Sequence, residues 1–375
     1  MHHYAFDLYY YNAVFAEKEN AVGGTMHTKI YGTIGPACQD TDTLVRLFEE
    51  GMTGIRVNLS HTSLRDASDW LERIHEAYRQ YCQGQECKKA MPEIVMDLQG
   101  PELRIGKLGT ERELEEGEGI TLVADGQNNL FDPTEIPVPA MLLPYLQPGQ
   151  EVLLDDGKIL LKIEELFRVK NGYVAETTVA RGGKLASRKS IALPCTSIYT
   201  PTLTESDLCN ISDAKKYGIT GVMLPFVRNQ EDLKNLKQAL IKEKAENIQI
   251  FAKIENLDGV NRLPELLPYC DEIVIARGDL GNAMPLWELP VVQAHIAATC
   301  REAGKPFMVV TQMLASMEER QVPTRAEVSD IFRAVMEGAS SVMLTGETAA
   351  GLYPVEAMRY MVKTVRAAEA YTGIN

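Results

Sequence analysis

The chain has 375 residues, a mass of 41.7 kDa and 45% hydrophobic residues, enough to bury one large core and a second small one. Its formal net charge of −14 argues against a general surface for nucleic acid or anionic membranes, so an anionic substrate would need a local cluster of basic residues and metal. No apolar run is long enough to span a bilayer, and the seven cysteines include no C-x-x-C pair, which suits a reducing cytoplasm.

Residues 1–25 differ from the rest of the chain. They are rich in tyrosine, carry Asp7 and Glu17, and lack the basic start and apolar centre of a secretion signal. We expect either a native arm that packs on the following domain or a remnant of the choice of start site, with Met26 as a reasonable first residue.

Eight apolar stretches rich in β-branched residues predict strands, and segments with helical periodicity separate most of them. The strands are expected at 28–34, 55–59, 93–98, 219–224, 248–254, 272–276, 306–310 and 340–344. The helices are expected at 40–50, 63–81, 204–217, 229–246, 258–268, 287–303, 325–338 and 354–370. Such an alternation closes most economically as a TIM (β/α)8 barrel of the α/β class, with active-site groups at the carboxyl ends of the strands.

One connection breaks this alternation. The path from the third strand to the helix near residue 204 is far too long for a loop in a compact domain. We therefore expect 103–193 to form an inserted all-β domain after the third strand, while 26–102 and 194–375 form the barrel. At the catalytic rim, the insertion would act as a lid that excludes water when substrate binds. Its strands are expected at 120–123, 151–154 and 159–169, each before a turn that contains Asp125-Gly126, Asp156-Gly157 or Asn171-Gly172.

Two short motifs each place a carboxylate just past an apolar stretch. They are Ala-Lys-Ile-Glu-Asn at 252–256 and Ile-Ala-Arg-Gly-Asp-Leu-Gly at 275–281. Glu255 and Asp279 would supply hard oxygen ligands for a divalent cation such as Mg²⁺, and Lys253 would bring a positive charge to the same opening. A single carboxylate at a strand end is more often a solvated loop group, but two such ends with a lysine between them favour a metal site.

Polar residues also follow other strands of the expected barrel, where this fold carries its chemistry. From the second and third strands these are Arg56, Asn58, Ser60 and Asp97. From the fifth to the eighth they are Lys253, Glu255, Asp279, Thr311, Thr345 and Glu347.

Long motifs in this order resemble the pyruvate kinase family over about residues 28–370, and that family also inserts a β lid after its third strand. Besides the two motifs above, they are Thr-Lys-Ile-Tyr-Gly-Thr-Ile-Gly-Pro-Ala at 28–37, Gly-Met-Thr-Gly-Ile-Arg-Val-Asn-Leu-Ser-His at 51–61, Val-Met-Asp-Leu-Gln-Gly-Pro-Glu-Leu-Arg at 95–104, Thr-Gln-Met-Leu at 311–314, Pro-Thr-Arg-Ala-Glu at 323–327 and Leu-Thr-Gly-Glu-Thr-Ala at 344–349.

The resemblance implies transfer of the phosphoryl group of phosphoenolpyruvate to ADP, giving pyruvate and ATP through an enolate, with Mg²⁺ or Mn²⁺ and K⁺ as cofactors. Glu255 and Asp279 would bind the Mg²⁺. Lys253 would neutralise charge on the phosphoryl group in flight, and Arg56 would reach it from the other side. The Thr311 hydroxyl would join the backbone of the second motif in binding substrate.

Further roles follow from the same resemblance. The N–H groups of Gly278 and Asp279, at a helix start, would hold the substrate carboxylate together with Thr311. The monovalent-cation site would consist of Asn58, Ser60, Asp97 and the carbonyl of Leu98. The nucleotide would be bound by His61, Arg104 and Lys189, with Arg188 beside the last and Glu102 supporting Arg104.

Several positions depart from the family pattern, and the lost charge and hydrogen-bonding groups would weaken ADP binding or change the acceptor. Two other functions therefore stay open: an enzyme that uses the same Mg²⁺-enolate chemistry on another acid or acceptor, such as a lyase, an aldolase or another phosphotransferase, and a catalytically silent binding protein. The departures are Leu98 for Thr, Gln99 for Lys, Ala192 for Asn, Pro225 for Ser, Ala294 for Lys and Arg333 for Asn.

Typical members of the family continue into a C-terminal domain that carries effector sites and part of the tetramer contact, whereas this sequence stops near Asn375. We expect a short form without that domain. It would be a monomer or a homodimer formed through the barrel, with hyperbolic kinetics in phosphoenolpyruvate that sugar phosphates do not change.

Overall fold

The structure is a computed structural model that describes residues 28–60, 62–83, 91–126, 132–169, 172–194, 196, 198 and 200–373. The expected arm at 1–25 and the candidate residue His61 lie outside these residues. Eight parallel strands form a closed barrel, which confirms the predicted (β/α)8 fold, and all eight expected strand positions overlap observed strands. In barrel order they are β1 (Lys29–Thr33), β2 (Gly54–Asn58), β3 (Glu93–Asp97), β12 (Gly221–Leu224), β13 (Gln249–Ile254), β14 (Glu272–Ala276), β15 (Phe307–Val310) and β16 (Ser341–Met343).

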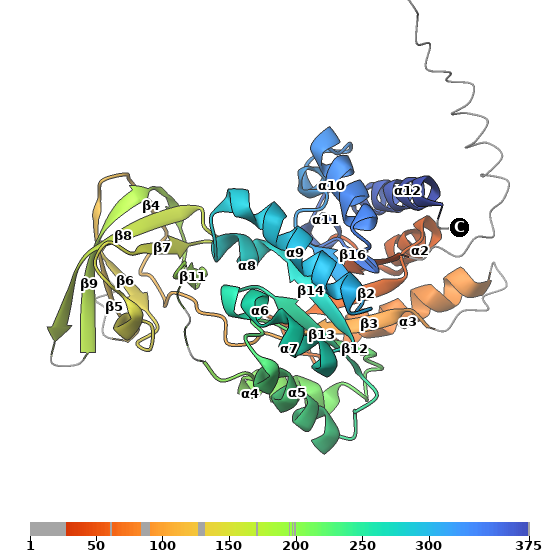
Figure 1. The fold of residues 1–375 in the computed structure, drawn as a ribbon, viewed down its shortest axis with the longest axis horizontal. Coiled ribbons are helices and arrows are strands. Elements are labelled where there is room, and N and C mark those ends of the chain that lie inside the picture. The colour runs from red at the N-terminus through yellow and green to blue at the C-terminus, as the bar shows by residue number, and fades with distance from the viewer. Residues whose placement is uncertain are drawn as a thin grey trace, which may run out of the picture.

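Helices surround these strands (Figure 1). No helix within the ranges given above combines the length and the apolar character needed to cross a membrane. The helices are α2 (Thr41–Glu50), α3 (Ser68–Gln83), α4 (Glu205–Asp213), α5 (Gln230–Lys242), α6 (Leu257–Asn261), α7 (Leu263–Leu266), α8 (Arg277–Asn282), α9 (Leu289–Glu302), α10 (Arg325–Met336), α11 (Gly346–Ala349) and α12 (Pro354–Thr372).

Two predicted helices differ most from the observed ones in extent, and those expected at 204–217 and 229–246 end four residues earlier, at Asp213 and Lys242. The helix expected from residue 63 begins only at Ser68, because Ser63 and Asp66 bond to each other in a preceding turn, with 2.6 Å between their side-chain oxygens. The helix expected at 258–268 is broken into α6, α7 and a 3₁₀ turn, because Pro264 and Pro268 each lack the N–H that a continuous helix needs.

The barrel has a packed interior as well as an apolar layer between strands and helices. Its strands are buried on both faces, which is why they read as nearly continuous apolar runs in the sequence. The side chains that fill the interior form one buried cluster of Tyr31, Val95, Met223, Phe251, Val274, Ala276, Met308, Val310 and Met343.

The insertion after β3 has sheets and a core of its own. A six-stranded sheet has the order β11-β7-β8-β9-β5-β6, and β4 pairs with β10. Its apolar cluster runs from Ile105 to Leu193, separate from the barrel clusters. Figure 1 shows this unit to one side of the barrel, with β11 nearest to it. The strands are β4 (Arg112–Leu114), β5 (Gly119–Ala124), β6 (Glu135–Val138), β7 (Glu151–Leu154), β8 (Ile159–Val169), β9 (Gly172–Arg181), β10 (Gly183–Leu185) and β11 (Ile191–Ala192).

Candidate active site

Lys253 and Glu255 lie at the carboxyl end of β13, where the barrel opens. The Lys253 Nζ is 2.9 Å from Glu255 Oε1 and 3.2 Å from Asp97 Oδ2 at the end of β3. Burial opposes the charge of the ammonium, but the two carboxylates outweigh it and raise the pKa of Lys253 above its usual range. The lysine is therefore charged at every physiological pH.

Arg56 completes this network from β2. Its Nε and Nη2 donate to Asp97 Oδ2 at 2.8 and 2.6 Å. Burial favours the neutral acid, but Lys253 and Arg56 together hold the pKa of Asp97 below its usual range. The four side chains Arg56, Asp97, Lys253 and Glu255 thus form one chain of paired charges across the top of the barrel.

Asp279 lies in the first turn of α8, directly after β14. Its side chain is accessible from the pocket but enclosed by protein on its other sides. Burial and then the nearby charge of Glu255 raise the pKa of Asp279 to about 7, against the opposing effect of Lys253. A cation that binds between two such carboxylates at a solvent opening lowers the energy of their mutual repulsion.

The donor set fits Mg²⁺ bound mainly through water and substrate. In the described residues, no group of three or more His, Cys, Asp and Glu side chains is arranged to hold a metal ion. Glu255 Oε2 accepts a hydrogen bond from the Phe226 N–H at 2.7 Å, so this carboxylate is fixed in place. Two carboxylates with open positions beside them are what Mg²⁺ uses when it also binds substrate phosphate.

The residues expected at the monovalent-cation site are neighbours in the structure. Asn58 lies opposite Asp97 in the pairing of β2 with β3, and the Ser60 hydroxyl donates to Asn58 Oδ1 at 2.9 Å. Leu98 directly follows the end of β3 and is buried. The oxygens of Asp97, however, already face Arg56 and Lys253.

Thr311 follows β15 with an unusual backbone. Thr311 and Gln312 have φ angles of 76° and 55°, which are rare for residues other than glycine and cost on the order of 1–3 kcal/mol each. Gly278 lies against this turn, because a Cβ added to it would be 3.1 Å from Thr311 Cγ2. The two expected contacts for the substrate carboxylate are therefore side by side.

The basic residues expected to bind nucleotide are tied to the lid. Lys189 Nζ is 2.7 Å from Asp155 Oδ1. Arg104 pairs with Glu102 at 2.9 Å, and its Nη1 donates to the Arg188 carbonyl at 2.8 Å. None of these contacts joins Lys189 or Arg104 to the two carboxylates at the ends of β13 and β14.

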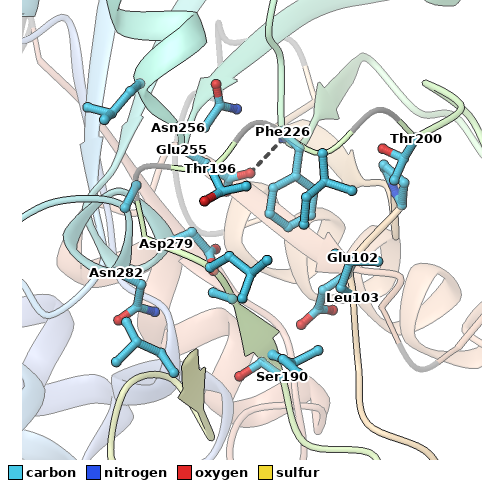
Figure 2. Close-up of a pocket in the computed structure, with 18 of the residues that line it drawn as sticks. Glu102, Leu103, Ser190, Thr196, Thr200, Phe226, Glu255, Asn256, Asp279 and Asn282 are labelled. Atoms are coloured by element: carbon cyan, nitrogen blue, oxygen red, sulfur yellow. Dashed lines mark hydrogen bonds between the residues drawn. The ribbon is translucent and has the colours of Figure 1, made fainter. Parts of the chain in front are cut away.

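A cavity of about 200 Å³ separates the lid from the barrel and reaches both proposed metal ligands. In Figure 2, Asp279 and Glu255 line it from the barrel, while Glu102, Leu103 and Ser190 face it from the other side. Asn256 and Asn282 also line it and were given no role in the sequence analysis, although Asn256 ends the first carboxylate motif and Asn282 directly follows the second.

Thr345 and Glu347, which were predicted among the polar residues that follow barrel strands, have another role. Glu347 is buried and accepts hydrogen bonds from the N–H groups of Leu314 and Thr345 at 2.9 and 2.7 Å. The Thr345 hydroxyl also lies 3.2 Å from Glu347. Both residues therefore shape the loops around the site and do not face the cavity.

The departures from the family pattern are spread over the molecule. Ala192 lines the cavity. Pro225 fills the space where a Cβ on Gly100 would lie, 2.4 Å from the Pro225 Cγ. The N–H of Gln99 donates to Asp207 Oδ1 at 2.9 Å. Asp207 is buried and was missed by the sequence analysis. The last two lie on outer helices: Ala294 on α9, and Arg333 on α10, where it pairs with Glu337.

Comparison with known proteins agrees with this geometry. The family model "Pyruvate kinase, barrel domain" matches residues 25–358. The pyruvate kinase of Geobacillus stearothermophilus is 38% identical over 335 residues, covering 89% of this chain and 55% of that protein. The enzyme of Methylorubrum extorquens is also 38% identical, over 89% of this chain and 67% of its own length. The enzyme of Schizosaccharomyces pombe is 36% identical, over 92% and 66%.

The chain thus spans between about half and two thirds of the length of these relatives. The family model covers well over half of this chain, and it includes every strand end described above. On these grounds the chain belongs to the pyruvate kinase family.

Proposed function

We propose that the protein transfers the phosphoryl group of phosphoenolpyruvate to ADP, giving pyruvate and ATP. The observation that supports this best is the position of Lys253, held charged between Asp97 and Glu255 beside the accessible carboxylate of Asp279. Phosphoryl transfer is catalysed mainly by positioning and by stabilising charge, and this opening supplies both.

Each side chain would have a distinct task in that reaction. The N–H groups of Gly278 and Asp279 and the Thr311 hydroxyl would hold the substrate carboxylate. Lys253 would stabilise charge on the phosphoryl group as it moves between donor and acceptor. When bound by Glu255 and Asp279, Mg²⁺ would supply charge neutralisation to the enolate and the phosphate oxygens.

The remaining assignments belong to the same proposal. Arg56 would contact the phosphoryl group from the side of β2. K⁺ would bind beside it, at Asn58, Ser60, Asp97 and the Leu98 carbonyl. His61, Arg104 and Lys189 would bind the nucleotide, residues 103–193 would close over it as a lid, and the protein would work in the cytoplasm.

A lactate-dehydrogenase-coupled assay tests the proposal directly. We expect turnover that requires phosphoenolpyruvate, ADP and Mg²⁺ together and that K⁺ increases. If the protein with Mg²⁺ and both substrates forms pyruvate no faster than the same mixture without protein, the proposed function is contradicted.

A further inference from the structure

Arg277 makes several side-chain hydrogen bonds beside the proposed carboxylate site, although the sequence motifs gave it no role. It is the first residue of α8, and only 11% of its side chain is exposed. Its Nη2 donates to the Thr311 carbonyl at 2.7 Å, and its Nε lies 3.2 Å from the same oxygen and 3.3 Å from the Val310 carbonyl. Its Nη1 donates to Asp330 on α10 at 2.5 Å.

These contacts act where the backbone is strained. Thr311 and Gln312 both have left-handed φ angles, and such a conformation persists only when its surroundings fix it. One guanidinium holds the Thr311 carbonyl through two nitrogens, which a single-point ammonium cannot do. The ion pair with Asp330 keeps the guanidinium itself in place.

The same side chain also connects the two parts of the carboxylate site. Gly278 follows Arg277 directly, and its Cα hydrogen faces the Thr311 side chain. The Thr311 hydroxyl has no hydrogen-bond partner among the residues that the structure describes, so it is available to a ligand. A shift of the turn after β15 would therefore move this hydroxyl away from the N–H groups of α8.

We propose that Arg277 is a positioning residue that fixes the turn at Thr311, and with it the geometry of the site for the substrate carboxylate. Asp330 serves the same purpose by orienting the guanidinium. This inference rests on the proposed function for the identity of the substrate, and on the contacts above for the role of the arginine.

The kinetic test compares Arg277→Met, Arg277→Lys and Asp330→Asn with the unchanged protein. For Arg277→Met we expect the KM for phosphoenolpyruvate to rise and kcat/KM to fall roughly 10²-fold, because a displacement of about 1 Å in a positioned group has effects of this size. The KM for ADP should stay the same. Arg277→Lys and Asp330→Asn should show the same split with smaller changes, since each keeps part of the network.

A merely structural role would give a different result. A smaller folded fraction lowers the apparent kcat and leaves both KM values unchanged, and that outcome would overturn the proposal. Arg359→Met is the matched control, because Arg359 forms a similar two-nitrogen pair with Glu50 on the outer helices. It should leave both KM values unchanged.

A second measurement does not depend on the reaction. Amide hydrogen exchange of the peptide at 311–314 should become faster in Arg277→Met, while exchange in β16 stays the same. Unchanged exchange at 311–314 would overturn the role of Arg277 even if the protein proved to catalyse another reaction. If the unchanged protein does not use phosphoenolpyruvate but exchange at 311–314 is faster in Arg277→Met, only the proposed function is contradicted.

Discussion

The side chains around Lys253 maintain its positive charge as well as its position. Asp97 and Glu255 keep it protonated despite burial. We expect Lys253→Met to lower kcat by roughly 10³-fold with substrate affinity largely kept, because a charge that acts on the phosphoryl group matters most in the transition state. Steady-state kinetics would check this, with Lys234→Met on the surface of α5 as the control. A variant that mainly raises KM would assign Lys253 to ground-state binding.

The proposed metal ligands make a second prediction, in which the two variants lose the same function but differ in stability. Asp279→Asn should abolish Mg²⁺-dependent turnover. Without metal it should melt at the same temperature as the unchanged protein or higher, because it removes the repulsion from Glu255. Glu255→Gln should also abolish turnover, but with some loss of stability, because Lys253 and the Phe226 N–H lose a charged partner. Comparable turnover in either variant would contradict the metal site.

The raised pKa of Asp279 gives a third prediction. Only the ionised carboxylate binds metal, so protons compete with Mg²⁺ once the pH falls below about 7. The dissociation constant of Mn²⁺, used as the probe, should rise up to about tenfold for each pH unit below that value and level off above it. Isothermal titration calorimetry across this range would measure it. An affinity that changes only below about pH 5 would mean that Asp279 titrates as an ordinary aspartate.

At the scale of elements, the end of β14 far from the site carries a buried acid that the mechanism does not use. Glu272 accepts hydrogen bonds from the hydroxyls of Ser340 and Ser341. Burial raises the pKa of Glu272, while these serines and Lys29 oppose the shift. Folding therefore shifts Glu272 toward its neutral form relative to the unfolded chain, so its contribution to stability is present at acid pH and is lost as pH rises through the folded pKa.

Glu272→Gln tests this sign. The amide keeps a hydrogen-bonding group without a buried charge, so the variant should be as stable as the unchanged protein or more stable at about pH 8, by on the order of 1 kcal/mol. It should lose that advantage near pH 4, where the glutamate is neutral. Denaturant titration at both pH values would measure the difference, and a variant destabilised more at the higher pH would contradict it.

The elements also show what the sequence could predict. All eight barrel strands were found because burial on both faces makes most positions of β1 to β3 and β12 to β16 apolar, with polar residues mainly at the strand ends. The lid strands β4 and β11, with three and two residues, are too short to show a period of two and were missed.

Part of the candidate site followed from local motifs, and part depends on contacts between distant segments. Glu255 and Asp279 could be proposed because each lies beside its own strand. The buried Asp207 and the arginine that holds Thr311 could not, because their partners are supplied by other elements of the barrel. The left-handed backbone at Thr311 could not be predicted from the sequence either, because threonine rarely adopts this conformation.

At the scale of the whole molecule, the lid and the barrel have separate apolar cores and meet around the cavity that contains Asp279. Few of the lining residues come from the interior of either core. The chemistry is thus assembled from strand ends and loops, and a change in the position of the lid would alter access to the carboxylates without disturbing either core.

The outer surface of the barrel supports the last prediction, that two copies associate. Leu286, Trp287 and Val291 lie within six residues of one another before and within α9, and are 70%, 80% and 69% exposed. Neighbouring exposed apolar side chains of this size favour burial against a partner. We expect a homodimer by light scattering, and Trp287→Glu should convert it to a monomer with its fold intact. Ile241→Glu changes an exposed apolar residue of α5 and should leave the mass unchanged. A monomeric unchanged protein, or a dimer that survives Trp287→Glu, would show that this surface does not join two copies.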